Sequence, residues 1–273
     1  MSTQDSQLST RDLIKVPAVT LGFWIVKIAA TTLGETGGDW VTMSLNLGYL
    51  IGSLIFAAFF IVFVAGQIRA RAYNPALYWA TIVATTTLGT TMADFADRSL
   101  GVGYPGGVSI VLTLLIASLL VWYWVEGTVA IKSVDHARAE WFYWVTILFS
   151  QTLGTALGDW VAGDDRGGLG LGYEYGALIF GGALVVIAAA YLWTRMSRTA
   201  LFWLAFILTR PLGATLGDLF DKPVAQGGLA VSRLYASLIL VVFIVVGVWI
   251  ISRRHGAAVE REREMESIER ERQ

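Results

Sequence analysis

One phrase occurs four times along the chain, and its spacing restricts the fold more than any other feature. The copies are TTLGETGGDW (31–40), TTLGTTMADF (86–95), QTLGTALGDW (151–160) and RPLGATLGDL (210–219). A tryptophan precedes each aspartate by fifteen residues, and a Leu-Gly pair stands at the same offset in every copy. Successive aspartates are 55, 65 and 59 residues apart, which is room for two membrane-length helices and two short loops. The repeats therefore predict four consecutive helical hairpins.

The chain is apolar enough for these hairpins to lie in a bilayer. Charged residues make up 15% of its 273 residues, against about 25% in an average soluble domain. Eight segments approach or exceed the roughly 20 mainly apolar residues that a membrane crossing needs. They are 16–34, 40–68, 72–93, 99–125, 141–158, 175–194, 199–217 and 234–252, of which only the first and seventh are interrupted by a basic residue. The sequence predicts an all-α polytopic membrane protein with eight transmembrane helices.

An even number of crossings in each repeat predicts that all four copies insert in the same direction. We therefore expect four parallel two-helix repeats around a pseudo-symmetry axis, unlike the inverted repeats of many carriers. The domains expected are a cytoplasmic tail (1–15), a membrane domain (16–252, with repeats 16–68, 72–126, 139–194 and 198–252) and a charged, helical cytoplasmic tail (253–273).

Basic residues predict the orientation, because loops rich in Lys and Arg stay in the cytoplasm. Before the residues beyond 254 are counted, ten basic residues stand on the side of the N-terminus, and four, Arg98, Arg166, Lys222 and Arg233, stand on the other. Both termini are therefore expected in the cytoplasm, with the repeated aspartates toward the outer face.

These motifs resemble a family of bacterial inner-membrane proteins built from four tandem two-helix repeats of unknown function, each with a characteristic tryptophan. The resemblance covers roughly residues 17 to 252, and the repeated W-x8-LG-x4-D spacing carries it. It implies a polytopic protein of the bacterial inner membrane and brings no established substrate.

Small residues recur four apart in every phrase and predict close helix packing. The pairs are Gly34 and Gly38, Gly89 and Ala93, Gly154 and Gly158, and Gly213 and Gly217.

Each repeated aspartate follows the second small residue, about 22 Å along the helix from its tryptophan at 1.5 Å per residue. A single such carboxylate is most simply a solvated or capping group at the interface. Four equivalent carboxylates near one axis repel each other unless a cation, basic side chains or protons compensate them. A shared cation or proton site is therefore predicted, with separate structural roles as the alternative; the candidate metal ligands are Asp39, Asp94, Asp159 and Asp218.

Polar residues continue inward from the aspartates on the same helix faces. Three ionisable residues also break the apolar spans and are functional candidates by their position. We expect Glu35 to pair with Lys27, unless Lys27 extends to the cytoplasmic interface, and one of the aspartates to pair with Arg210. The candidate ion- or solute-binding residues besides the aspartates are Lys27, Thr31, Glu35, Thr86, Gln151 and Arg210.

Several functions are disfavoured by what the chain lacks. It has no cysteine and no P-loop, and its two histidines are not spaced as metal ligands. We expect no enzymatic activity, no nucleic-acid partner and no cofactor other than a bound cation. The acids of the predicted outer loops, Asp97, Asp164, Asp165 and Asp221, are explained equally well by solvation and by attraction of cations.

The leading hypothesis is a secondary transporter or channel for a hard cation, either a divalent metal such as Mn²⁺ or Mg²⁺ or a proton-coupled species. A transporter of a small organic or anionic solute, with Lys27 and Arg210 as contacts, is the first alternative. A membrane scaffold or sensor acting through the charged tail is the second. The partners expected are the lipid bilayer and a small ion or solute, and a homo-oligomer is compatible with the sequence.

Overall fold

The computed structural model describes the backbone of residues 15–271 and the side chains of residues 15–253. The N-terminal tail predicted for residues 1–15 lies almost wholly outside the described residues, as do the side chains of the C-terminal tail beyond 253. The described part is helical and contains no strand. Its elements are α2 (Leu21–Asp39), η1 (Trp40–Ser44), α3 (Gly48–Arg69), α4 (Pro75–Asp94), η2 (Phe95–Ser99), α5 (Tyr104–Glu126), η3 (Ile131–Ser133), α6 (Ala137–Ala162), α7 (Gly172–Trp193), α8 (Arg198–Asp221), η4 (Val224–Gln226) and α9 (Arg233–Glu271).

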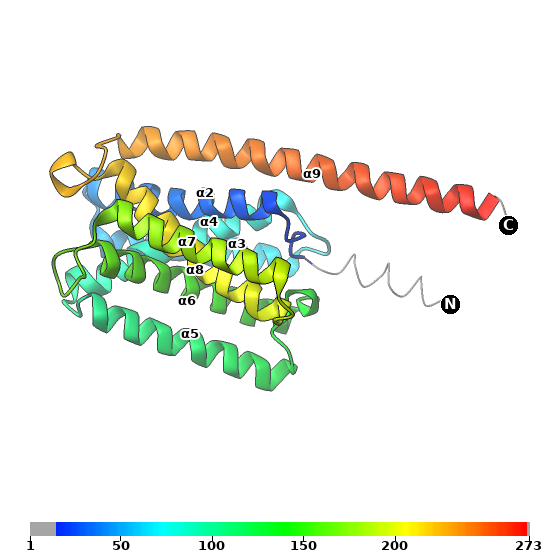
Figure 1. The fold of residues 1–273 in the computed structure, drawn as a ribbon, viewed down its shortest axis with the longest axis horizontal. Helices are drawn as coiled ribbons and strands as arrows, with labels where there is room; N and C mark the ends of the chain where they lie inside the picture. The colour runs from blue at the N-terminus through cyan, green and yellow to red at the C-terminus, as the bar shows by residue number, and fades with distance from the viewer. Residues whose placement is uncertain (1–14, 272–273) are drawn as a thin grey trace.

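The long helices lie side by side along one direction, and α9 extends beyond the bundle (Figure 1). The first helices of the four repeats form a closed ring, in which α2 packs against α4, α4 against α6, α6 against α8, and α8 against α2. The second helices lie outside this ring. Each packs on the inner helix of the following repeat, α3 on α4, α5 on α6 and α7 on α8, and α9 packs on α2.

The glycine of each Leu-Gly pair lies where two inner helices approach most closely. A methyl group there would collide with the residue eight positions before the aspartate of the next repeat. At Gly89 and Gly213 it would also collide with backbone atoms of the neighbouring helix. The four contacts are Gly34 on Thr86, Gly89 on Gln151 and Thr152, Gly154 on Arg210, and Gly213 on Thr31. The second small residues lie in the same interfaces, with Gly38 on Thr90, Gly158 on Ala214, Gly217 on Glu35, and Ala93 in an apolar cluster with Leu153 and Ala156.

An aromatic layer closes the end of the ring opposite to the aspartates. The residue before each repeated tryptophan contacts the tryptophan of the next repeat. The ring centroids are 5.5 Å apart for Phe23 and Trp79, 5.7 Å for Tyr78 and Trp144, 6.4 Å for Tyr143 and Trp203, and 5.8 Å for Phe202 and Trp24. This layer contributes much of the apolar core of the described residues and shuts that end of the ring.

Five of the described helices, α3, α5, α7, α8 and the part of α9 up to Arg253, are long and apolar enough to cross a membrane. The outer helices among them expose many large aliphatic and aromatic side chains, as helices in contact with lipid do. The protein is therefore indicated to be a multi-pass membrane protein. Helices α2, α4 and α6 fall short of that hydropathy because they carry buried polar residues on the faces that meet inside the ring.

Candidate functional site

The four repeated aspartates lie together at one end of the helix ring. Asp39, Asp94, Asp159 and Asp218 are all buried, with at most 4% of each residue exposed. Carboxylate oxygens of Glu35, Asp39 and Asp94 lie within 4.8 Å of one another, and so do those of Asp39, Asp218 and Asp221. We call the four repeated aspartates the acidic layer.

Arg98 joins two members of the acidic layer. It lies in η2, directly after α4, and its Nε donates to Asp94 Oδ1 at 2.6 Å. Its Nη2 lies 3.7 Å from Asp159 Oδ2 on α6. The Asp94 carboxylate is the main cause that raises the pKa of Arg98 above its ordinary value, so the guanidinium remains charged despite its burial.

Lys222 joins the other two members. Its Nζ donates to Asp39 Oδ2 and lies 2.9 Å from Asp218 Oδ1 and 3.9 Å from Asp221 Oδ1. Burial by itself lowers the pKa of Lys222, but the carboxylates of Asp218, Asp39 and Asp221 outweigh it and raise the pKa well above its ordinary value. The acidic layer is thus compensated by two tethered cations of the chain itself.

Both cations come from a motif that the sequence analysis missed. Arg98 and Lys222 stand four residues after the aspartates of the second and fourth repeats, in DFADR (94–98) and DLFDK (218–222). The first and third repeats have Met43 and Gly163 at this position. The negative charge of the acidic layer is therefore compensated from alternate repeats, the second and the fourth. The D-x-x-D-[RK] spacing in the sequence could have identified both basic residues.

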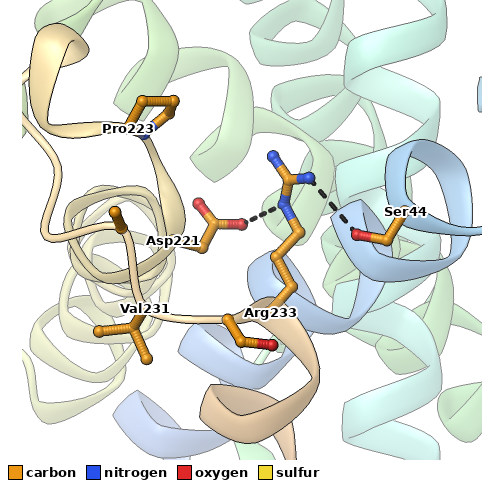
Figure 2. Close-up of a pocket in the computed structure, with 7 residues that line it drawn as sticks. Ser44, Asp221, Pro223, Val231 and Arg233 are labelled. Carbon is orange, nitrogen blue, oxygen red and sulfur yellow. Dashed lines mark hydrogen bonds and ion pairs between the residues drawn. The ribbon is translucent and has the colours of Figure 1, made fainter.

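The sequence left two explanations open for Asp97 and Asp221, solvation and attraction of cations. Solvation is wrong for both, because they are buried, with 1% and 7% exposed. Asp221 accepts a hydrogen bond of 2.7 Å from Arg233 Nε, and Arg233 Nη1 donates to Ser44 at 3.4 Å (Figure 2). Figure 2 shows Arg233 reaching from the start of α9 across an open pocket toward Asp221. Arg233 also lies 3.8 Å from Asp39, so it covers this half of the acidic layer.

Arg210 fills the centre of the ring below the acidic layer and has no exposed surface. Its Nη2 lies 3.0 Å from Glu35 Oε2 on α2, donates to Thr155 Oγ1 on α6 at 2.6 Å, and also donates to Thr90 Oγ1 on α4. These three partners stand four residues before the aspartates of their repeats. The fourth residue at that position is Ala214, and this small side chain belongs to the helix that supplies the arginine.

The ion pairs differ from both pairings expected from the sequence. Arg210 pairs with Glu35, not with an aspartate of the acidic layer. Glu35 therefore does not form an ion pair with Lys27, which lies eight residues earlier on the same helix. A lysine side chain on a helix points toward the N-terminus, and this direction leads Lys27 away from Glu35.

Lys27 is fully buried in an apolar layer, so extension to the interface is also wrong. The equivalent residues of the other repeats are Ile82, Ile147 and Phe206. The Lys27 ammonium lies 4.0 Å from the centroid of the Phe206 ring and 3.5 Å from both Gln151 Oε1 and Thr209 Oγ1. No described carboxylate lies within ion-pair distance of it.

The remaining sequence candidates, Thr31, Thr86 and Gln151, stand at the position that Arg210 occupies in the fourth repeat, eight residues before the aspartate. Thr31 Oγ1 donates to the carbonyl oxygens of Ile28 and Thr209. Thr86 Oγ1 and Gln151 Nε2 are buried and have no hydrogen-bond partner among the described atoms. The ring thus brings all the predicted polar residues into one central column, closed at its lower end by the aromatic layer.

Negative charge is in excess in this column and around its open end. The carboxylates are Glu35, Asp39, Asp94, Asp97, Asp159, Asp218 and Asp221, whereas the cationic side chains are Lys27, Arg98, Arg210, Lys222 and Arg233. Four carboxylate oxygens near Arg98 are buried without a hydrogen-bond partner among the described atoms, namely Asp94 Oδ2, both oxygens of Asp97, and Asp159 Oδ2. The Lys222 half has two such oxygens, on Asp218 and Asp221, but there two cations, Lys222 and Arg233, face three carboxylates. Arg98 is the only cation within ion-pair distance of any of the three carboxylates of its half among the described residues, so that half is the more negative one.

Two clusters of three carboxylates are close enough to hold a metal ion, and each already contacts a basic side chain of the protein. Arg210 bonds to Glu35, and Lys222 bonds to Asp39 in both groups. Oxygen ligands of this kind suit hard cations. A divalent ion would nevertheless have to displace or share these contacts, whereas a proton needs only one free carboxylate oxygen.

Comparison with known proteins identifies the repeat. A family described as Repeat of Unknown Function (DUF347) matches residues 22–73, 77–128, 142–197 and 201–256. Each match spans one inner helix and the outer helix that follows it. No curated protein and no solved structure was found to match the chain. Because the four matches cover most of the chain, the prediction of four tandem repeats of unknown function is confirmed, and the protein belongs to the DUF347 repeat family.

Proposed function

We propose that the protein is a secondary transporter in which the acidic layer binds the transported or coupling cation. The observation that carries this proposal is the excess of carboxylates enclosed by a ring of membrane helices. Unpaired negative charge in a membrane protein is costly and marks ion or proton pathways. A cation or proton that binds here lowers that cost, and this gives the site its affinity.

A proton is favoured over a divalent metal as the bound species. Most of the carboxylate oxygens of the site without a hydrogen-bond partner lie around Arg98, whereas Asp218 Oδ1 and Asp221 Oδ1 lie 2.9 and 3.9 Å from Lys222 Nζ. The groups with metal-like spacing involve acids that already bond Lys222 and Arg210. Protonation of one carboxylate removes a charge without disturbing either cation. We therefore propose proton-coupled transport. Transport of Mn²⁺ or Mg²⁺ at the same site is the alternative, and a metal-flux assay distinguishes the two.

An anionic or small organic solute is the second candidate, and Lys27 favours it. Its ammonium faces two neutral oxygens and an aromatic ring, so an anion would provide the charge partner that it lacks in the described residues. Arg210 is less suited to this role because Glu35 already neutralises it. Under this alternative, replacement of Lys27 by methionine impairs transport more than replacement of any aspartate by asparagine.

The proposed topology has all eight long helices crossing the inner membrane as four parallel repeats, with both termini in the cytoplasm. Helices α2, α4 and α6 contain 19, 20 and 26 residues, which corresponds to about 28–39 Å at 1.5 Å per residue. They are long enough to span the roughly 30 Å hydrocarbon core. Their polar faces point into the ring, where lipid does not contact them.

The topology predicts which loops a reagent can reach from outside the cell. The chain has no cysteine, so single cysteines can be introduced without a background. Leu169 and Met196 are exposed, at 56% and 49%, in the loops at opposite ends of α7. We expect a membrane-impermeant maleimide to label Leu169→Cys in intact cells and to label Met196→Cys only after lysis. The reverse result would invert the proposed orientation, and labelling of both in intact cells would contradict the eight-helix topology.

Transport is tested in proteoliposomes with an imposed pH gradient. Asp94→Asn and Asp159→Asn should each reduce proton flux by about tenfold or more, because one charge-assisted contact of about 1.5–3 kcal/mol corresponds to that factor. The matched control is Asp164→Asn, since Asp164 is exposed in the loop after α6 and its loss should leave flux unchanged. Mn²⁺ flux measured in parallel distinguishes a metal substrate. Flux that is indifferent to substitution throughout the acidic layer would remove the proposal, and a phenotype lost only on deletion of residues 254–273 would favour the scaffold alternative.

A further inference from the structure

Asp97 is a buried carboxylate that no contact in the site accounts for. The residue is 1% exposed, and neither of its oxygens has a hydrogen-bond partner among the described atoms. It lies in η2 against the first turn of α5, where any side chain at Gly107 would collide with its carboxylate. Ser99 and Leu100, which follow it, are exposed. The carboxylate is therefore close to water yet enclosed by protein.

The fourth repeat shows a carboxylate at this position that has a cationic partner. Asp221 occupies the equivalent position, three residues after the repeated aspartate, and Arg233 at the start of α9 donates to it at 2.7 Å (Figure 2). In the second repeat the first residue of the outer helix is Tyr104. Its hydroxyl donates to Asp165 at 3.0 Å and not to Asp97. The second repeat therefore lacks the partner that stabilises Asp221.

The other charged groups around Asp97 are directed elsewhere. On its own element, Arg98 donates its Nε to Asp94 and turns its Nη2 toward Asp159 of α6. From the loop between α6 and α7, Arg166 bonds to Asp165. The nearest acid is Asp94, whose negative charge opposes a second negative charge at Asp97. No described side chain thus neutralises Asp97.

We infer that Asp97 is a proton-binding site, and that its carboxyl exchanges a proton with the outer aqueous phase. Burial raises the pKa of Asp97 to about 7, the Asp94 carboxylate acts in the same direction, and Arg98 and Arg166 oppose them. Asp97 is therefore protonated in mildly acidic solution and carries a charge in mildly alkaline solution. The inference rests on the proposed function in one respect, namely that this proton is the one coupled to transport.

Infrared difference spectroscopy of the purified full-length protein tests the site without any transport assay. Between pH 5 and about 9, wild-type protein should lose a protonated-carboxyl C=O band with a midpoint near pH 7, as the pKa of Asp97 implies. Other buried carboxyls of the site contribute to the absorption in this range, so Asp97 is identified by the part of the band that its replacement removes. Asp97→Asn should lose a component with a midpoint near pH 7, whereas the matched variant Asp221→Asn should keep that component. A band of unchanged amplitude in Asp97→Asn, or wild-type protein with no band titrating in this range, would overturn the inference.

A second variant supplies the missing partner instead of removing the carboxyl. Tyr104→Arg places a guanidinium at the start of α5, as Arg233 stands at the start of α9. An opposite charge at hydrogen-bond distance should move the midpoint of the Asp97 component toward acid pH by about one pH unit. An unchanged midpoint in folded Tyr104→Arg would overturn the assignment to Asp97.

The pH dependence of stability is a further readout that works even where a variant folds poorly. The pKa of Asp97 is about 7 in the folded protein and about 3.9 in an unfolded chain, so the folded state binds more protons between these values. Its contribution to stability is complete below about pH 4 and is lost as pH rises to about 7. The apparent melting temperature in detergent should therefore fall over this range more steeply for wild type than for Asp97→Asn. Equal slopes would contradict the inference.

Failure of this inference and failure of the proposed function give different results. If the band behaves as expected but no pH-driven flux is measured, Asp97 binds a proton and the transport proposal fails. If flux depends on Asp94 and Asp159 while the band keeps its full amplitude in Asp97→Asn, transport stands and the proton site lies elsewhere.

Discussion

Replacement of Arg210 by methionine is expected to destabilise the protein by about 3–5 kcal/mol, the largest effect of any single change at the site. The guanidinium is fully buried and donates hydrogen bonds to three other inner helices, at Glu35, Thr90 and Thr155. Its removal leaves Glu35 as an uncompensated buried charge, and breaking a buried ion pair from one side carries a cost of this size. The measurement is the apparent melting temperature and the yield of monodisperse protein in detergent.

The control for this prediction removes both charges. Arg210→Met combined with Glu35→Gln leaves no buried charge behind and should recover much of the lost stability, because replacing a whole buried pair is often nearly neutral. Arg210→Lys should be intermediate, since a lysine cannot reproduce the several contacts of a guanidinium. A double variant as unstable as the single one would show that the arginine stabilises the ring by packing alone.

The second large effect is expected at Gly89, where a Cβ atom would meet the backbone of a neighbouring helix. A Cβ atom there would lie 2.8 Å from the backbone nitrogen of Thr152 and 2.9 Å from the backbone carbonyl carbon of Gln151. Backbone atoms of α6 cannot rotate away as a side chain can, so Gly89→Ala must separate α4 from α6. Overpacking of this kind costs about 1–3 kcal/mol, and the displacement also disturbs the contacts above it. We expect a lower apparent melting temperature together with reduced flux.

Gly182 provides the matched control for Gly89. It lies within α7, outside the ring, and nothing stands within 4 Å of the position where its Cβ would be. Alanine is a better helix former than glycine by about 1 kcal/mol, so Gly182→Ala should be neutral or slightly stabilising. If both alanine variants were equally tolerated, the inner helices would not be packed as closely as the structure has them.

The repeat made much of the architecture predictable. Its spacing indicated the four hairpins, and the recurring small residues indicated where helices would approach. Gly154 and Gly213 illustrate the limit of that reasoning. The sequence shows that each belongs to a packing face, but the residue that fills the space above it, Arg210 or Thr31, comes from a helix that only the closed ring brings alongside.

The charge pairs were less predictable because they cross between repeats. Lys27 and Glu35 share a helix and have opposite charges, yet side-chain direction separates them and Glu35 meets Arg210 from a helix 175 residues away. Asp97 and Asp221 stand beyond the apolar spans and resemble solvated loop acids. Their burial depends on where α5 and α9 begin, and the sequence does not show which of those helices supplies an arginine to its acid.

Residue order was enough to predict the local and periodic properties of this protein: helical segments, their grouping into four repeats, and equivalent aspartates at equivalent depths. These follow from positions along a single helix, where rise and periodicity are constant. The folded arrangement was needed to see that Arg98 and Lys222 each join two aspartates, that Arg210 occupies the centre and that Asp97 has no hydrogen-bond partner among the described atoms. Each of these depends on contacts of a few ångströms between distant segments, and electrostatic free energy at such distances changes sign with the partner that packing provides.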